Sequence, residues 1–218
     1  MRSSVGVKAR SYLCYKKLNR QKIYILNEGR KNMSTGIIIY GATGSGKTTL
    51  GKELAYRLDF QHVDIDDYIW RWDTVIPYTI LRPREERIEY LMNAISKCRH
   101  FVMTGSMGSI RESFNSLFDL AVFITVPVEI RLERLRTRES AMFGERILVD
   151  GDMYEQNLKF FEDAVQYDTG EPPQICLKHH EQWSGELSCP VLRVDGTKAI
   201  SENAAWIADQ FLQRSSVE

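Results

Sequence analysis

The sequence predicts an α/β domain in which five parallel strands lie between two layers of helices. Three observations predict this fold. The length of 218 residues suits one domain. Apolar residues make up 43% of the chain, which is enough for a core. Short apolar runs alternate with amphipathic segments, as in βαβ units, whose right-handed crossovers place helices on both faces of a parallel sheet.

The first half of the chain contains three expected strands. The run 36–40 is apolar and β-branched, the run 60–64 ends in acidic residues, and the run 100–103 is again apolar. The helix after the first strand has an apolar face made of Leu50, Leu54, Ala55 and Leu58. Residues 66–82 are irregular and aromatic. Pro83 suits the first turn of the next helix, whose apolar face is made of Ile88, Leu91, Met92 and Ile95.

The second half supplies the remaining two strands. The run 120–126 is the fourth strand, and a charged helix is expected from about residue 127 to residue 138. A loop at 139–151 leads to a helix whose apolar positions are Tyr154, Leu158, Phe161 and Val165. The run 190–194 is the fifth strand and residues 200–212 form the last helix. Residues 168–189 have no clear pattern.

A net charge of zero hides an uneven distribution of charge. Residues 1–33 hold nine Lys or Arg and one acid, Glu28, whereas the rest of the chain holds 20 basic and 28 acidic side chains. Because the chain after residue 33 is acidic, it is not an obvious nucleic-acid binder. The basic head has three interpretations: an artefact of start-site choice, with Met33 as the natural start, a disordered basic arm, or a targeting segment. It lacks the apolar region of a secretory signal.

Two further classes of protein are excluded by composition. The longest apolar runs, 37–40 and 120–127, are far shorter than the roughly 20 residues of a membrane span. The cysteines form no CxxC pair, so a disulfide scaffold or a thiolate zinc site is not expected. They are Cys14, Cys98, Cys176 and Cys189. Reduced thiols in a cytoplasm are the default expectation.

A glycine-rich segment between the first strand and the first helix fits the pattern GxxxxGK[ST], the Walker A phosphate-binding loop (P-loop). It reads Gly41-Ala-Thr-Gly44-Ser45-Gly46-Lys47-Thr48. Its glycines let backbone N–H groups point at phosphate oxygens, and the helix N-terminus adds its positive end. Lys47 is expected to reach the β- and γ-phosphates and Thr48 to bind Mg²⁺. The alternative, a dinucleotide-binding loop, needs a glycine where Lys47 stands.

Charged residues cluster at two further places. Asp64, Asp66 and Asp67 lie at the carboxyl end of the second strand, the edge where such sheets bind ligands, and carboxylates this close make Mg²⁺ a natural partner. The alternative is an exposed acidic turn. On the charged helix, three arginines are spaced as on one face and suit phosphate, although a solvated helix has the same pattern. They are Arg131, Arg134 and Arg138.

Other side chains have a functional and a structural interpretation. Arg82, Arg84 and Arg87 suit an anionic acceptor or a solvated helix start. Trp70 and Trp72 suit stacking on an acceptor or packing under a lid. Arg146 suits phosphate contact from the lid. The four histidines have no metal-ligand spacing and are interpreted as structural or exposed; they are His62, His100, His179 and His180.

From about residue 36 to residue 212, the chain resembles the adenylate kinase and shikimate kinase branch of P-loop folds. The segment Asp195-Gly-Thr-Lys-Ala-Ile200 resembles the adenine-side loop of adenylate kinases, and Val126-Pro127 with the two later arginines resembles the start of their lid. Val63-Asp64-Ile-Asp66 resembles the acidic pair of shikimate kinases. The chain departs from both families after the third strand, at Thr104-Gly105-Ser-Met-Gly108, so the acceptor stays open.

The resemblance implies a P-loop kinase domain at 34–218, with an acceptor region at about 66–98 and a short lid at about 138–151. It implies catalytic roles for Lys47, Asp66 and Arg138, and Mg²⁺ contacts at Thr48 and Asp64. ATP contacts are expected from Gly41, Gly44, Ser45, Gly46, Lys47, Thr48, Thr49, Arg134, Gly196 and Lys198. Acceptor contacts are expected from Asp66, Arg82, Arg84 and Arg87.

The expected function is therefore transfer of the ATP γ-phosphate to a small molecule, at a hydroxyl group, with ATP and Mg²⁺ as cofactors. One alternative is a nucleoside monophosphate kinase. An alternative of another class is a nucleotide-dependent switch with slow hydrolysis, and a third is a nucleic-acid enzyme that uses the basic head. A cytoplasmic monomer or homodimer is expected, with no nucleic-acid or membrane partner.

Overall fold

The protein, in a computed structural model, is described over residues 35–214. The predictions for residues 1–33 lie outside this range. Five strands form one parallel sheet in the order β2-β3-β1-β4-β5, which confirms the predicted fold class. They are β1 (Thr35–Gly41), β2 (Gln61–Asp64), β3 (His100–Thr104), β4 (Leu120–Thr125) and β5 (Val191–Asp195).

Helices connect the strands and cover both faces of the sheet. The α-helices are α2 (Lys47–Leu58), α3 (Asp66–Ile69), α4 (Arg84–Ile95), α5 (Val128–Phe143), α6 (Tyr154–Gln166), α7 (Leu177–Glu186) and α8 (Ile200–Arg214). Short 3-10 helices are η1 (Gly108–Ser113), η2 (Asn115–Leu117) and η3 (Gly144–Ile147).

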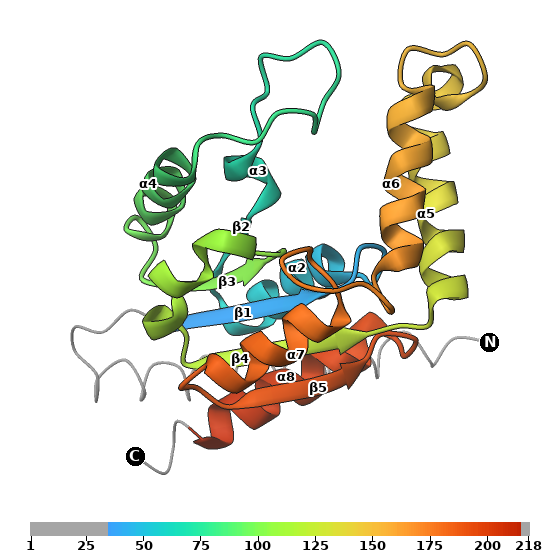
Figure 1. Cartoon of the computed structure of the whole chain (residues 1–218). Coiled ribbons are helices and arrows are strands. Elements are labelled where there is room, and N and C mark those ends of the chain that lie inside the picture. Colours follow the sequence, from blue (N-terminus) through green and yellow to red (C-terminus); the bar gives the residue numbers. More distant parts are fainter. Residues whose placement is uncertain (1–34, 215–218) are drawn as a thin grey trace, which may run out of the picture.

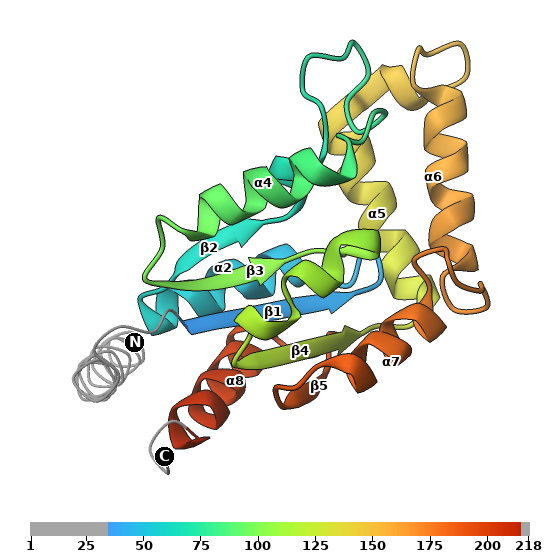
Figure 2. The ribbon, with the colours of Figure 1, turned by 60° about the vertical axis from the view of Figure 1, so that its left-hand side comes forward.

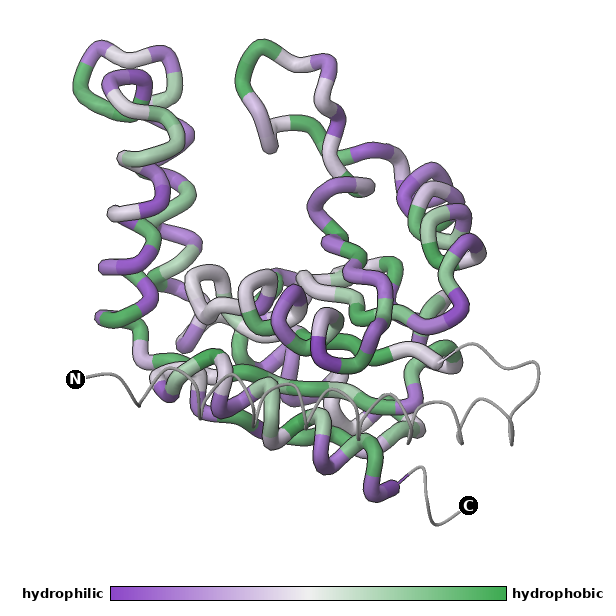
Figure 3. The backbone as a smooth tube through the Cα atoms, turned by 180° about the vertical axis from the view of Figure 1, so that it is seen from behind, coloured by the Kyte–Doolittle hydropathy of each residue, from purple (hydrophilic) through white to green (hydrophobic). Residues whose placement is uncertain are grey.

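Alternate residues of the strands face two separate cores. Ile37 and Ile39 of β1 point to one face, where α2 and α8 pack on them, while Ile38 and Tyr40 point to the other, which α4, α7 and η1 cover. All four side chains are fully buried. Burying each such side chain contributes roughly 1.5–3 kcal/mol, so β1 is firmly held. Figure 3 shows hydrophobic residues along the strands and hydrophilic residues recurring along α4, α5 and α6.

Two arms rise above the carboxyl edge of the sheet, where the strands end (Figure 1). One arm consists of α3, α4 and the loop between them, and the other is the antiparallel pair α5 and α6. A second view shows the loop of the first arm near the turn that joins α5 to α6 (Figure 2). Two hydrogen bonds join them: Arg146 Nη2 donates to the Val75 carbonyl at 3.4 Å and Gln156 Nε2 to the Pro77 carbonyl at 3.0 Å.

Three segments differ from the sequence expectation. The charged helix α5 runs on to Phe143 because its buried positions Arg131, Leu135 and Glu139 continue at helical spacing, and it ends at Gly144, whose φ of 55° requires glycine. The region predicted to be irregular contains α3 and an antiparallel bridge between Trp70 and Leu81.

The unassigned segment 168–189 contains α7, whose buried residues include His180 and Trp183. Pro83 lies at the N-cap of α4 and not inside its first turn. Within residues 35–214, no helix is long and apolar enough to cross a membrane. The three cysteines of this range are free thiols.

Candidate active site

The P-loop curls between the end of β1 and the start of α2. Gly44 and Gly46 have φ of 78° and 92°, a backbone region that favours glycine. Helix α5 lies directly against the loop, because a Cβ added at Gly44 would be only 2.8 Å from the Arg131 carbonyl oxygen. The Ser45 hydroxyl is buried and has no hydrogen-bond partner among residues 35–214, which leaves a donor inside the curl for a ligand oxygen.

Lys47 lies across the mouth of this loop. Its Nζ donates a hydrogen bond to the Ala42 carbonyl at 2.7 Å. The pKa of Lys47 is lowered to about 8, mainly by burial; Asp66 and Asp64 oppose the shift, and the charge of Arg138 adds to it. The Lys47 ammonium group therefore lies within electrostatic reach of two carboxylates and of Arg138 on α5.

Thr48 and Asp64 meet beside the loop. The Thr48 hydroxyl donates to Asp64 Oδ2 at 2.8 Å, and Asp64 Oδ1 accepts from the Asp66 backbone N–H at 3.3 Å. Oxygen donors of this kind suit Mg²⁺, which is held by one or two protein oxygens together with water and phosphate. Within residues 35–214, no group of three or more His, Cys, Asp or Glu could hold a metal ion. The residues fit Mg²⁺ only with phosphate as a further ligand.

Asp66 begins the first arm and faces the P-loop. Trp70 Nε1 donates to Asp66 Oδ1 at 3.3 Å, and Oδ2 has no hydrogen-bond partner among residues 35–214. Enclosure by the protein and the charge of Asp64 raise the pKa of Asp66, while Lys47 and Arg138 oppose the shift. The Asp66 side chain still contacts solvent, so the carboxyl group is crowded on the protein side and open on the other.

Aromatic residues enclose the same corner. The Tyr78 ring lies edge-on to Trp70 and Trp72, with centroid distances of 6.0 and 5.0 Å. Tyr78 has φ of 59°, which is uncommon for a bulky residue and is found at functional sites more often than elsewhere. Burial raises its pKa, Asp66 and Asp67 raise it further, and Arg138 opposes them. The phenol therefore lies within electrostatic reach of both arms.

The three arginines of α5 separate into different environments. Arg131 is fully buried and binds the Val126 and Ala164 carbonyls and Asp168, so it joins α5 to α6 instead of facing phosphate. The predicted common phosphate face is wrong for Arg131, since its position belongs to the buried stripe of the helix. Arg134 Nη2 donates to the Gly196 carbonyl at 3.0 Å, and Nη1 lies 3.5 Å from the Ser45 carbonyl.

The loop after β5 lies next to Arg134. Asp195 Oδ1 accepts from the Thr197 backbone N–H at 2.8 Å, which closes a tight turn, and Gly196 contacts Val126 so closely that a Cβ would approach to 2.5 Å. Lys198 pairs with Glu202 at 3.6 Å on the surface of α8. Arg134 thus bridges the P-loop and the predicted adenine-side loop.

The three predicted acceptor arginines have different surroundings: Arg82 contacts its own arm, and Arg84 contacts η1. Arg82 lies over the Tyr90 ring at 4.5 Å and pairs with Glu86 at 3.6 Å. Arg84 Nε donates to the Ser109 carbonyl at 3.2 Å. Arg87 Nε is buried without a hydrogen-bond partner among residues 35–214. None of the three forms a hydrogen bond or ion pair with Asp66 in the part of the chain that the structure describes.

Sequence reasoning missed a buried polar chain behind the P-loop. His180 Nδ1 lies 2.7 Å from the Tyr167 hydroxyl, and its Nε2 lies 3.4 Å from the Ser106 hydroxyl, just beyond β3. The pKa of His180 is lowered to about 3, mainly by burial and also by the charge of Lys47, so the ring is neutral near pH 7. The interpretation of His180 as structural agrees with its burial, but no sequence signal connected it to Ser106.

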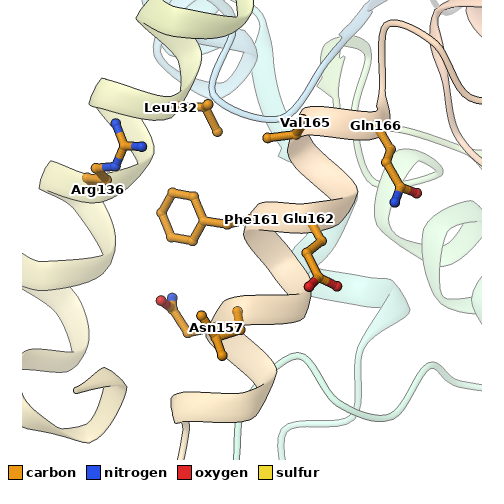
Figure 4. Close-up of a pocket in the computed structure, with 8 residues that line it drawn as sticks. Leu132, Arg136, Asn157, Phe161, Glu162, Val165 and Gln166 are labelled. Atoms are coloured by element: carbon orange, nitrogen blue, oxygen red, sulfur yellow. The ribbon is translucent and has the colours of Figure 1, made fainter. Parts of the chain in front are cut away.

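A groove of about 550 Å³ runs between α5 and α6 (Figure 4). Leu132, Phe161 and Val165 supply its apolar wall, and it contains none of the predicted site residues. It is the seam between the two helices of one arm and lies apart from the chemistry around Lys47.

Comparison with known proteins places the chain in a family. Residues 37–151 match the family described as an AAA domain. The uncharacterized protein YqaC of Bacillus subtilis is 35% identical over 177 residues, which cover 81% of this chain and 97% of that protein. Shikimate kinase of Neisseria gonorrhoeae is 31% identical over 119 residues, 50% of this chain and 70% of that enzyme.

Among solved structures, shikimate kinase from Acinetobacter baumannii in complex with shikimate aligns with a TM-score of 0.48 at 17% identity, over 86% of this chain and 98% of that one. The family match covers more than half of this chain, and the Neisseria enzyme is matched over more than two thirds of its length. The chain therefore belongs to the AAA domain family and is a P-loop small-molecule kinase of the branch that includes the shikimate kinases.

Proposed function

We propose that the protein transfers the γ-phosphoryl group of ATP to a hydroxyl group of a small molecule, in a reaction that depends on Mg²⁺. The observation that carries the proposal is the position of Asp66. Its carboxyl group lies within electrostatic reach of Lys47 and Arg138, and one of its oxygens has no hydrogen-bond partner among residues 35–214. A carboxylate so placed can accept a hydroxyl proton beside the transferring phosphate.

In the proposed reaction, the acceptor oxygen forms a bond to the γ-phosphorus while the bond from that phosphorus to the bridging oxygen of ADP breaks. The hydroxyl proton moves to Asp66, whose raised pKa suits a group that must receive it. Lys47 and Arg138 stabilise negative charge on the transferring group. Thr48 and Asp64 would hold Mg²⁺, which would neutralise charge at the phosphates.

The nucleotide contacts follow from the same geometry. The backbone of Gly41, Gly44, Ser45 and Gly46 cradles the phosphates, and Thr48 and Thr49 begin the helix behind them. Arg134 lies over the base, between the P-loop and Gly196, and the backbone near Lys198 borders it. We place these roles within a kinase domain that spans 34–218.

Closure of the two arms gives the reaction its protection from water. Arg146 and Gln156 of the second arm already bind carbonyl groups of the first. Arg146 also forms a two-pronged pair with Asp152, at 2.9 and 2.7 Å, so it fastens the turn that closes over the site. Exclusion of water favours transfer to the acceptor over hydrolysis.

A hydroxyl acceptor fits the first arm better than a nucleoside monophosphate does. The phosphate of a monophosphate is already an anion and needs several cations around it, yet Arg82 and Arg84 are engaged on Tyr90, Glu86 and Ser109, which leaves Arg87 alone of the three without a partner among residues 35–214. The corner at Asp66 instead presents a carboxylate beside three aromatic rings. Such a corner suits a neutral hydroxyl on a carbon skeleton with an apolar face. The relationship to shikimate kinases supports the same choice.

An ADP-release screen tests the proposal. Purified protein is mixed with MgATP and, one at a time, shikimate and related acids, sugars, nucleosides, nucleoside monophosphates and aminoglycosides. The expected result is faster ADP release with a hydroxyl compound, abolished in Lys47→Ala and retained in the matched surface variant Lys52→Ala. Stimulation only by nucleoside monophosphates supports the first alternative. Hydrolysis that no small molecule stimulates, but that a protein partner does, supports a nucleotide switch.

A further inference from the structure

Arg138 and Glu139 are neighbours in α5 and form an ion pair of unusual geometry. Arg138 Nε and Nη2 both approach Glu139 Oε1, at 2.9 and 2.7 Å. The Arg138 side chain is 50% exposed, whereas the Glu139 side chain is only 9% exposed. Glu139 is thus fixed inside the protein, while the Arg138 side chain that it holds is half exposed.

Consecutive residues of a helix do not face each other, because they are about 100° apart around the axis. Glu139 belongs to the buried stripe of α5, together with Leu135, one turn earlier. For the pair to form, the Arg138 side chain must bend back toward that stripe. A surface arginine with no such partner would extend into water, where its charged group is best solvated.

The bend directs the guanidinium inward. Its carbon lies 5.7 Å from the centroid of the Phe160 ring on α6. Its charge also acts on Lys47, Asp66 and Tyr78, which belong to the P-loop and the opposite arm. Glu139 therefore holds a guanidinium whose charge reaches all three of these groups.

We infer that Glu139 is a positioning residue for phosphoryl transfer: it keeps the Arg138 guanidinium turned toward the transferring phosphate. The inference rests on the proposed function, since it assumes that Arg138 acts on that phosphate. A hydrogen bond from a guanidinium to a carboxylate is strong, and an oriented cation loses less entropy on meeting its anion than a freely moving one does. Glu139 itself contacts no nucleotide in this account.

The experiment measures ATP turnover in Arg138→Ala, Glu139→Gln and the double variant, with [γ-³²P]ATP, alone and with each compound of the screen above. Arg138→Ala should lower turnover about 10²–10³-fold, as loss of one charge-stabilising donor does. Glu139→Gln keeps the size of the side chain but loses its charge, and should lower kcat about tenfold, as loss of outer-shell support does elsewhere, with KM for ATP unchanged. The double variant should be no slower than Arg138→Ala.

Matched controls separate positioning from stability. Glu133→Gln makes the same change on an exposed site of the same helix and should leave kcat unaltered. Melting temperatures identify a variant that fails to fold, and the nearly isosteric Glu139→Gln keeps the volume of the buried side chain so that a loss of kcat can be measured in folded protein. A merely structural Glu139 would lower the melting temperature of the double variant and add its effect to that of Arg138→Ala.

Each outcome is decisive. Normal kcat in folded Glu139→Gln overturns the inference but leaves the proposed function intact, and so does an additive loss in the double variant. A wild-type protein that turns over no ATP with any compound overturns the proposed function, and the inference falls with it. A tenfold loss in Glu139→Gln that disappears in the Arg138→Ala background supports both.

Discussion

The phosphate side and the acceptor side of the candidate site are built in different ways. On the phosphate side, the backbone forms the binding surface, and it follows β1, whose central residues are fully buried. On the acceptor side, side chains form the surface, and they lie on a short helix and a loop in which Trp72 is 48% and Val75 88% exposed. A backbone held by the core can recognise the phosphate groups, which are the same in every reaction of this kind. Exposed side chains can differ from one protein to the next and so can match different acceptors.

This difference separates phosphate binding, which the fold itself can provide, from acceptor binding, which depends on individual side chains. A phosphate cradle needs a strand, a glycine-rich turn and a helix N-terminus, all of which are local. An acceptor pocket needs side chains from separated positions, such as Asp66 at the start of α3 and Tyr78 in the loop before α4. Changes on the two sides should therefore have different kinetic signatures, and five predictions use them.

Asp66→Asn should give the largest effect, because it removes the proposed proton acceptor. Transfer should fall by about 10²–10⁴, the range lost with a positioned base, while ATP affinity stays nearly constant. Steady-state kinetics and a fluorescent ATP analogue measure the two quantities. Asp67→Asn, one residue along, is the matched control. A mild Asp66→Asn effect beside a severe loss of acceptor affinity in Arg87→Ala would favour a monophosphate acceptor.

Lys47→Ala comes next and tests the phosphate side. Its ammonium group faces developing negative charge, so its loss should lower the rate on the order of 10²–10³-fold. Circular dichroism should remain unchanged, because Lys47 lies at the start of α2 and belongs to neither hydrophobic core. Near-normal turnover by the folded variant would refute the assignment.

Arg134→Ala should act on the nucleotide alone. Loss of a cation over the base is worth roughly 0.5–2 kcal/mol, so ATP affinity should weaken by about 2- to 30-fold with kcat little changed. Arg136→Ala, two residues along the same helix, should leave both constants unaltered. If Arg134→Ala leaves ATP affinity at the wild-type value, the bridge to Gly196 serves the fold only.

The pH dependence of kcat/KM for ATP gives a smaller effect. Lys47 in the nucleotide-free protein has a pKa lowered to about 8, and only its protonated form attracts phosphate. kcat/KM should therefore fall as pH rises through about 8, by roughly tenfold for each further pH unit. The Asp66 base must be ionised, so an acid limb should lie above the ordinary range of aspartate. A profile flat from pH 7 to pH 10 would contradict the role of Lys47.

Removal of residues 1–32 should have the smallest effect. The charge of the chain changes sign at Met33, and the head has no periodic apolar face. The shortened protein should match the full chain in melting temperature and ATP affinity. A drop of more than about 5 °C, equivalent to over ~1 kcal/mol for a domain of this size, would show that the head packs on the body.

Most of the sheet and the P-loop could be predicted because their signals are local. Hydrophobic runs mark the strands, and the spacing of Lys47 and Thr48 from Gly41 marks the loop. Contacts between distant segments could not be predicted. Nothing local distinguishes Arg131, which turns inward to Asp168, from Arg134, which reaches Gly196.

The end of α5 shows the same limit from another direction. The buried face of α5 continues through Glu139. Glutamate is rarely buried, so its presence in the sequence does not indicate a buried helix position. The predicted helix therefore ended at residue 138. Both the true end of α5 and the pairing of Glu139 were missed. The two histidines of α7 were likewise uninformative, because burial behind β1 depends on the whole fold.

The fate of the γ-phosphate tests the central claim most directly. Enzyme in excess over [γ-³²P]ATP, with the best compound of the ADP-release screen, is stopped during a single turnover, and the labelled products are separated. The account predicts that most of the label is on the organic acceptor, attached through oxygen, and that Asp66→Asn slows its arrival at least a hundredfold. Label found only as inorganic phosphate, at a rate that the compound does not change, would contradict it.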